Sequence, residues 1–338
     1  MATWQVERVL HFGSDDLLVD GLAHFGFHVR GAGYHAIAHR RHILAAVDDR
    51  GRLRWTAAAE PVATRVPNIT VPLDYPMYVD RLADGSLVVS NFGSTCIYRI
   101  DAERRTAELL VDGRALGMVD MGNCVVDREG SIWVNEVTGC RVWQLEASGR
   151  VVRVLGDGSA GFQRDPVGFD EVRFGWIYDL RRGPDDRLYV LDSHNFALRV
   201  IEPAAQRVVT LVGDGTAGRA AEDEDIATAR FGSDPGATFD GPISLAIDEA
   251  GRAFVGDRYN HVVRMVDPAS RRVTIIAGRA AADDEMPNDD DLRDPRHLNL
   301  PQISSLDYDA GRLYVPTDLG RGRGDLAVLT RGHAQKGS

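Results

Sequence analysis

The sequence predicts an all-β protein, a six-bladed β-propeller of four-stranded antiparallel blades. The main observation behind this prediction is an internal repeat, in which a turn is followed by a short apolar strand that ends on a polar residue. The repeat occurs at 85–91, 130–136, 186–192, 251–257 and 311–317. Recurrence of one such unit along a chain is typical of propellers and other repeat architectures.

Further apolar strands surround each repeat. In the best-preserved example, one strand precedes the turn at 244–248, and two follow the repeat at 262–266 and 273–277. Apolar strands joined by Gly and Asp turns predict one antiparallel sheet per repeat. Such a sheet cannot bury both faces alone, so we expect the sheets to stack radially around a central channel.

The third observation concerns the two ends of the chain. We place the six blades at roughly 33–66, 75–112, 121–156, 174–213, 241–278 and 301–330. The first blade is the most degenerate, with 34–38 and 42–46 expected as its two inner strands. The last has only three clear strands, and residues 4–10 are expected to supply its fourth, which closes the ring and leaves no open edge. This predicts a single domain over residues 1–332 and a flexible tail at 333–338.

Composition and charge exclude several classes of function. The net charge of −11 argues against nucleic-acid binding, which depends on clustered cations that release counterions. The sequence contains no apolar run long enough to span a membrane, and its first ten residues do not resemble a signal peptide. Three cysteines without CxxC spacing are typical of free thiols. We therefore expect a cytoplasmic protein.

Residues 241–278 resemble an NHL repeat, named after the Asn-His-Leu that corresponds here to Asn260, His261 and Val262. Residues 192–195 follow the same frame, although other blades carry Asn or Glu in place of the aspartate. The resemblance covers nearly the whole chain and implies the same propeller fold. It leaves the function open, because NHL propellers include both enzymes and interaction modules.

Polar and aromatic residues stand at or near the starts of the predicted inner strands. Since inner strands line the channel, these residues are expected to converge at one channel mouth and form a pocket. Carboxylates there can act as general acid or base, and the expected catalytic residues are Asp120, Asp179 and Asp240. The expected ligand-binding residues are His35, Tyr75, Tyr78, Asn123, Trp176, Tyr178 and Gln302.

Other polar groups receive a structural interpretation. Asp192 and Asp257 recur at one position of the repeat, which favours an Asx-type turn between the second and third strands. Three long connections, at 157–173, 214–240 and 279–300, are expected to shape one face. Their acidic runs lack the spacing of a calcium loop, and we interpret them as solvated charge.

No cofactor is predicted, although calcium binding in the channel is kept as an alternative. The resemblance offers one precedent for a metal site, a zinc-dependent amidating lyase of the same fold, whose zinc is held by histidines from separate blades. We reject that site because only His35 lies near such a position, and the histidines between His24 and His42 match no zinc motif. Lactonase-like propellers hold calcium in the channel, and Asp120, Asn123 and Asp240 would be the ligands here.

The leading functional prediction is a small-molecule enzyme of lyase, hydrolase or cyclase type, with its pocket at the channel mouth. The sequence contains no nucleophile elbow, P-loop or dinucleotide fingerprint. The alternative is a noncatalytic module that binds a protein or peptide through the same face. The predicted partners are thus a small-molecule ligand or a protein, with neither nucleic acid nor membrane.

Overall fold

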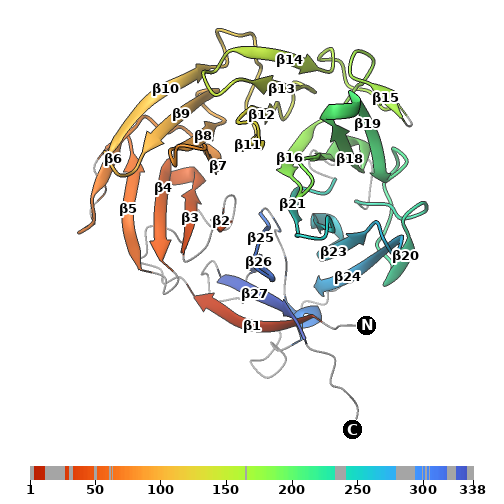
Figure 1. Ribbon diagram of the computed structural model, residues 1–338. Coiled ribbons are helices and arrows are strands. Elements are labelled where there is room, and N and C mark those ends of the chain that lie inside the picture. The colour runs from red at the N-terminus through yellow and green to blue at the C-terminus, as the bar shows by residue number, and fades with distance from the viewer. Residues whose placement is uncertain are drawn as a thin grey trace.

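The structure, a computed structural model, confirms the six-bladed β-propeller (Figure 1). Six sheets surround a central axis, and each sheet contributes its innermost strand to the wall of the channel. The strands that form this wall are β2, β7, β11, β16, β21 and β25. The residues described by the structure are 4–11, 27–29, 33–48, 52–60, 62, 64–163, 166–232, 241–278, 294–298, 300, 303, 305–317 and 325–332.

Blades 2 and 3 have the four strands that the repeat predicts. Blade 2 consists of β7 (Pro76–Arg81), β8 (Leu87–Asn91), β9 (Cys96–Asp101) and β10 (Thr106–Asp112). Blade 3 consists of β11 (Cys124–Val126), β12 (Ile132–Asn135), β13 (Val142–Leu145) and β14 (Val151–Leu155). All neighbouring strands in these two blades are antiparallel.

Blades 4 and 5 each gain a fifth strand at the rim. Blade 4 consists of β16 (Ile177–Arg182), β17 (Leu188–Asp192), β18 (Ala197–Glu202), β19 (Arg207–Val212) and, outermost, β15 (Val167–Gly168). Blade 5 consists of β21 (Ser244–Ile247), β22 (Ala253–Asp257), β23 (Val262–Asp267), β24 (Arg272–Gly278) and, outermost, β20 (Asp223–Asp225). The long connections predicted to cover a face therefore also extend the edges of two blades.

The first blade differs from the predicted assignment. It consists of β2 (Phe27–Val29), β3 (Gly33–Ala38), β4 (Ile43–Asp48), β5 (Leu53–Ala58) and β6 (Asn68–Thr70), in that order from the axis. The segments expected as its two inner strands are its second and third strands, and the innermost strand begins at Phe27. This short strand lacks the repeat pattern, so the sequence did not reveal it.

Blade 6 combines the two ends of the chain, as predicted. It consists of β25 (Asp307–Asp309), β26 (Arg312–Thr317), β27 (Asp325–Arg331) and β1 (Trp4–His11). Strand β1 pairs antiparallel with β27 over its whole length, from Trp4 opposite Arg331 to His11 opposite Asp325. Figure 1 shows the two strands side by side at the rim.

A tight turn recurs between the second and third strands of blades 1 to 5. One residue of this turn has a positive φ in blades 1 to 5, namely His42, Thr95, Cys140, Phe196 and His261. In blades 2 to 5, a glycine at the end of the fourth strand packs directly on the carbonyl of that residue. A Cβ on Gly213 would lie 2.3 Å from the Phe196 oxygen, and one on Gly278 would lie 2.1 Å from the His261 oxygen. Only glycine fits there.

The core lies between neighbouring blades, and the closing strand contributes to it. Trp4 of β1 meets the ring of Phe254 in blade 5 edge-on at 5.4 Å, and Tyr308 of blade 6 stacks on the same ring at 5.5 Å. Phe254 is fully buried. Strand β1 thus closes a sheet and also covers an inter-blade core.

Deleting residues 1–11 should therefore lower the melting temperature sharply, by roughly 10 °C or more, because it unpairs β27 and uncovers apolar surface. Differential scanning calorimetry measures the effect. The control is Glu7→Gln, which removes only the ion pair between Glu7 and Arg312 at 2.8 Å and should change little. An unchanged melting temperature in the deletion variant would contradict this closure.

Candidate functional site

One end of the propeller collects both the starts of the inner strands and the turns that follow the second strands. The register shows this, since Pro76 pairs with Asn91 and Ile177 pairs with Asp192. We call this end the upper face. The turns that join first to second strands lie at the opposite end, the lower face. The residues predicted to bind ligand were chosen largely from inner-strand starts, so most of them belong to the upper face or the channel.

A buried arginine crosses the channel. Arg181 of β16 holds its guanidinium 4.3 Å from the centroid of the Tyr78 ring in blade 2. It also donates to the carbonyl of Leu306 in blade 6 at 3.2 Å, and to the carboxylate of Asp179 in its own blade at 2.9 Å. Only 6% of Arg181 is exposed. One side chain therefore joins three blades across the axis.

Asp179, expected as a catalytic residue, is the counter-ion of this arginine. Its carboxylate also accepts from the amide of Asn123 in blade 3 at 2.5 Å and from the backbone N–H of Leu245 in blade 5 at 2.8 Å. Burial raises the pKa of Asp179, while the Arg181 guanidinium opposes that rise. The structure therefore brings Asp179, Asn123 and Tyr78 together around an ion pair within the channel wall.

Asp120 also has a full set of partners. Its carboxylate accepts from the backbone N–H groups of Val137 at 2.6 Å and Thr138 at 2.9 Å, and from the Thr138 hydroxyl at 2.5 Å. These donors belong to the turn between β12 and β13, so Asp120 fastens that turn to the start of the inner strand. Asp120 and Asn123 are directed to different partners, and Asp240, the third expected calcium ligand, lies outside the described residues.

Tyr75 lies on the upper face with two histidines and a carboxylate. Its ring meets His42 edge-on at 4.5 Å and His39 at 5.0 Å. Nδ1 of His42 lies 3.0 Å from the Tyr75 amide nitrogen and 3.2 Å from Oδ1 of Asp74. Tyr75 has a φ of 49° and is 40% exposed. A bulky residue in this backbone conformation is strained, and such strain is common at functional sites.

A second aromatic group stands at the start of β16. Trp176 stacks on His194 with ring centroids 4.0 Å apart, and the ring of Tyr178 lies 6.3 Å from the same imidazole. All three residues are partly exposed. His194 belongs to the turn η2 (Ser193–Asn195) between the second and third strands. Trp176 and Tyr178 were predicted as ligand-binding residues, whereas His194 was not.

His35 does not lie on an inner strand. It belongs to β3, the second strand of its blade, and its ring lies 5.7 Å from the ring of Trp55 in the fourth strand. Burial, with a smaller contribution from Arg81, lowers the pKa of His35 to about 4. The remaining predicted site residues, Asp240 and Gln302, lie outside the described residues.

The repeated aspartates Asp192 and Asp257 are fully buried structural anchors. Each accepts from the backbone N–H of the connection arriving from the previous blade, Gly175 at 2.8 Å and Gly232 at 3.0 Å. Asn195 and Asn260 donate to these carboxylates. The aspartates therefore hold the connection from the previous blade as well as the local turn that the sequence suggested. Burial raises the pKa of Asp192 to about 6.

Sequence reasoning missed the partners of these aspartates, Arg199 and Arg264. Both guanidiniums are buried, 3.5 Å and 3.6 Å from the respective carboxylates. They also donate to backbone carbonyls of the incoming connection, at Arg173 and Arg230. The sequence did contain a pattern that indicates this contact, because each arginine follows its aspartate at the same spacing in the two repeats.

The acidic run at 222–225 is paired with arginines. Asp223 contacts Arg272 at 2.7 Å, and Glu224 contacts the buried Arg264. The acidic run at 289–291 lies outside the described residues. Within the described ranges, no group of three or more His, Cys, Asp or Glu side chains is arranged to hold a metal ion. No helix among the same residues is long and apolar enough to span a bilayer.

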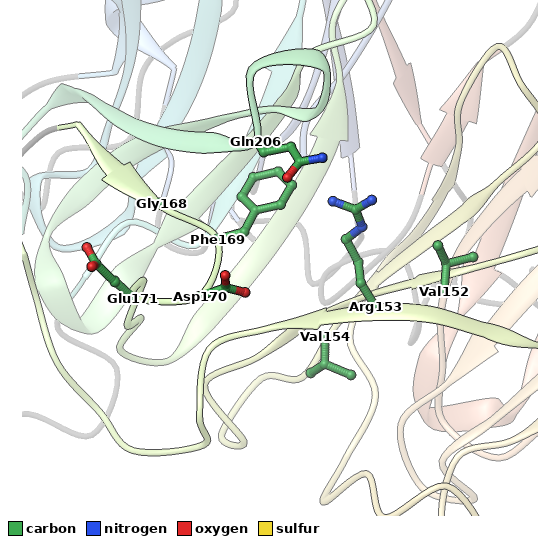
Figure 2. Close-up of a pocket in the computed structure, with 8 residues that line it drawn as sticks. All are labelled: Val152, Arg153, Val154, Gly168, Phe169, Asp170, Glu171 and Gln206. Atoms are coloured by element: carbon green, nitrogen blue, oxygen red, sulfur yellow. The ribbon is translucent and has the colours of Figure 1, made fainter.

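Two cavities lie away from the upper face. One, of about 360 Å³, opens at the lower face between turns of four blades, with Arg128 and Arg182 on one side and Glu249 and Asp309 on the other. The second, of about 440 Å³, is a groove at the rim between blades 3 and 4 (Figure 2). Neither was predicted, because the sequence does not reveal how the blade edges are spaced.

Replacing Arg181 with Met should destabilise the fold by about 3–5 kcal/mol, because it leaves the buried Asp179 without its counter-ion. Adding Asp179→Asn should restore much of that loss, since the two charges are then removed together. Urea titration of both single variants and the double variant gives the coupling. Glu146→Gln, in the exposed pair with Arg150, serves as the control and should have no measurable effect. Additive losses in the double variant would contradict a buried ion pair.

His35 should make the fold sensitive to acid. Its folded pKa of about 4 lies below the usual 6.5, so the unfolded chain binds the extra proton first as the pH falls. The stability that the neutral ring contributes is complete above pH 6.5 and is lost progressively down to about pH 4, on the order of 3 kcal/mol. His35→Phe keeps an aromatic ring and should flatten this part of the stability profile. An identical profile in the variant would contradict the assignment.

Comparison with known proteins gives partial sequence matches. The chain is 37% identical over 147 residues to Protein SUPPRESSOR OF QUENCHING 1, chloroplastic, from Arabidopsis thaliana, which covers 41% of this chain and 13% of that protein. It is 29% identical over 103 residues to NHL repeat-containing protein 2 from Homo sapiens, covering 30% of this chain and 12% of that one. The chain therefore matches only a small part of these relatives. No protein-family model matches it.

Solved structures resemble the whole chain. A Bacteroides thetaiotaomicron protein of unknown function has a TM-score of 0.67 at 12% identity, covering 97% of this chain and 76% of that one. Virginiamycin B lyase from Staphylococcus aureus has a TM-score of 0.53 at 12% identity, covering 97% and 99%. A luciferin-regenerating enzyme has a TM-score of 0.57 at 12% identity, covering 99% and 98%. At these identities the likeness shows the fold alone. With the partial match to NHL repeat-containing protein 2, the propeller confirms the resemblance of this chain to NHL-repeat propellers.

Proposed function

We propose that the upper face carries the active site of a small-molecule enzyme of lyase, hydrolase or cyclase type. The observation that carries this proposal is the group formed by His42, Asp74 and the strained Tyr75. An imidazole, a carboxylate and an exposed aromatic ring meet there beside the start of an inner strand. Such a group offers acid–base chemistry next to a surface on which a small molecule can stack.

The pair of His42 and Asp74 can exchange a proton. In the neutral ring, Nδ1 accepts the amide of Tyr75 at 3.0 Å. When Nδ1 takes up a proton, it releases the Tyr75 amide and donates to the carboxylate of Asp74, 3.2 Å away, which stabilises the imidazolium; Nε2 is then the nitrogen that would exchange a proton with the substrate. Both side chains are more than a third exposed, so a substrate can reach them. His42 would act as the general base or acid, and Asp74 would orient and stabilise it.

The other predicted residues have supporting roles in this proposal. Trp176 and Tyr178 would add aromatic surface at the start of β16, with His194 stacked on Trp176. Asp120 and Asp179 would hold the walls in place, because their carboxylates already accept several hydrogen bonds. Arg181 would close the channel beneath the site.

Enzymes occur among the similar propellers, which supports the proposal without identifying the reaction. The virginiamycin B lyase and the luciferin-regenerating enzyme share this architecture over nearly the whole chain. Their low identity carries neither a substrate nor a catalytic residue across to this protein.

A second candidate function is supported by exposed apolar side chains on the same face. Phe92 is 38% exposed, Leu116 39% and Val119 64%. They lie in connections and turns that end at the upper face, and the Phe92 amide donates to the Tyr75 carbonyl at 2.9 Å. Exposed apolar surface of this kind fits a binding module that recruits a protein or peptide.

The test is turnover of a library of lactones, esters and small cyclic metabolites, followed by mass spectrometry. His42→Asn and Asp74→Asn should each reduce turnover at least tenfold with little change in melting temperature, because general acid–base groups typically contribute a factor of about 10² to 10⁴. Asparagine tolerates the positive φ of His42, so the backbone should be preserved.

The matched control is His261→Asn. His261 occupies the same turn position in blade 5, with φ 55° against 57° for His42, and should retain full turnover. Equal losses in both histidine variants would contradict a specific role for His42. If no compound is turned over, and a Phe92→Ser/Val119→Ser variant loses binding to a captured protein partner, the binding module is the correct function.

A further inference from the structure

Among the described residues, the outermost strand of blade 3 has no neighbour on its outer side. In the described part of the chain, β14 ends its sheet, whose order from the axis is β11, β12, β13 and β14. Two side chains on this edge strand, Val152 and Val154, are 44% and 37% exposed. An edge of this kind presents unpaired backbone groups beside apolar surface, which is how sheets recruit a further strand.

Three other blades carry an extended strand at this position. β6, β15 and β20 pair with the fourth strands of blades 1, 4 and 5, and the last two of these pairings are antiparallel. In blades 4 and 5 the added strand comes from the long connection between blades. The connection into blade 3 spans only residues 113–123, and no strand in it pairs with β14. The rim position of blade 3 is therefore not filled by the described chain, as in blades 2 and 6.

A groove runs beside this edge. Its other wall consists of residues 168–171 and Gln206 of blade 4, and its volume is about 440 Å³ (Figure 2). A second depression of about 390 Å³ shares Val154 and residues 169–171, so the groove continues along the rim. Strand β14 is five residues long, which gives a length of about 16 Å for backbone pairing.

Arg153 is the one cation among the residues that line the groove, whose other wall also carries the carboxylates of Asp170 and Glu171. It lies between the two exposed valines, and its guanidinium stands 5.4 Å from the ring centroid of Phe169 across the groove. Nε of Arg153 is buried and has no hydrogen-bond partner among the described residues. Figure 2 shows the side chain rising from β14 toward Phe169 and Gln206. A carboxylate on an added strand would satisfy it.

We propose that this rim groove binds an extended peptide segment of a partner protein, which pairs with β14 as a fifth strand. The alternation along β14 sets the chemistry of the segment. An acidic residue faces Arg153, and the residues on either side of it are apolar and pack on Val152 and Val154. The groove is at the rim, so this interaction is independent of the proposed active site on the upper face.

The probes are two fluorescein-labelled peptides with the cores Thr-Val-Glu-Val-Thr and Thr-Val-Lys-Val-Thr, each flanked by two serines. Fluorescence anisotropy with the full chain should show at least about tenfold tighter binding of the Glu peptide, equivalent to one favourable charge contact. Arg153→Glu should reverse this preference. Hydrogen exchange should show new protection of β14 amides when the Glu peptide is bound.

Val152→Lys/Val154→Lys should abolish binding of both peptides, while Leu109→Lys, at a residue 52% exposed on the outer strand of blade 2, should leave binding unchanged. Melting temperatures verify that each variant is folded. Absence of binding at 1 mM peptide, or a preference that Arg153→Glu does not alter, would overturn the proposal. So would a dimer in sedimentation that the valine double variant dissociates, because a second copy of the chain would then occupy the edge.

Discussion

The ion pair between Arg181 and Asp179 links the centre of the propeller. A propeller closes only if its innermost strands are held at fixed distances around the axis, where side chains have little room. Arg181 reaches Tyr78 in blade 2 and Leu306 in blade 6, while Asp179 reaches Asn123 in blade 3 and Leu245 in blade 5. Removing two charges from water is costly, and this cost is offset by their mutual contact and by the hydrogen bonds that Asn123, Leu245 and Leu306 of three other blades make to them.

In the proposed function, Arg181 and Asp179 close the centre of the channel and separate its two ends. Side chains at the starts of the inner strands can then form a mouth with a floor, while the lower face carries a different set of charges around its own cavity. The buried carboxylates therefore serve the scaffold, and groups with solvent access are the ones left for chemistry. His42, Asp74 and Tyr75 are such groups, since their side chains are exposed and Tyr75 has an unusual backbone conformation.

The fold could be predicted from sequence because it depends on local patterns that recur. Turns and apolar strands reappear in each well-preserved blade, and the Asp–Asn pair reappears in blades 4 and 5. The closing strand follows from counting the strands of the last blade. Strand β2 escaped prediction because three residues carry no period. The functional residues were harder to predict. In the sequence, a carboxylate at the start of an inner strand cannot be distinguished by whether it contacts substrate or a backbone amide. Asp120 and Asp179 were chosen on position alone, and only their partners show what they hold. His42 was visible as one of several histidines, but its contact with Asp74 joins residues of two blades.

The most direct test of the proposed site is a crystallographic fragment screen of the wild-type protein. The account predicts that polar aromatic and heterocyclic fragments gather above Arg181, in contact with Tyr75 and within hydrogen-bond distance of the imidazole of His42. Fragments found only in the lower cavity or at the rim, with the upper mouth empty in every data set, would contradict it.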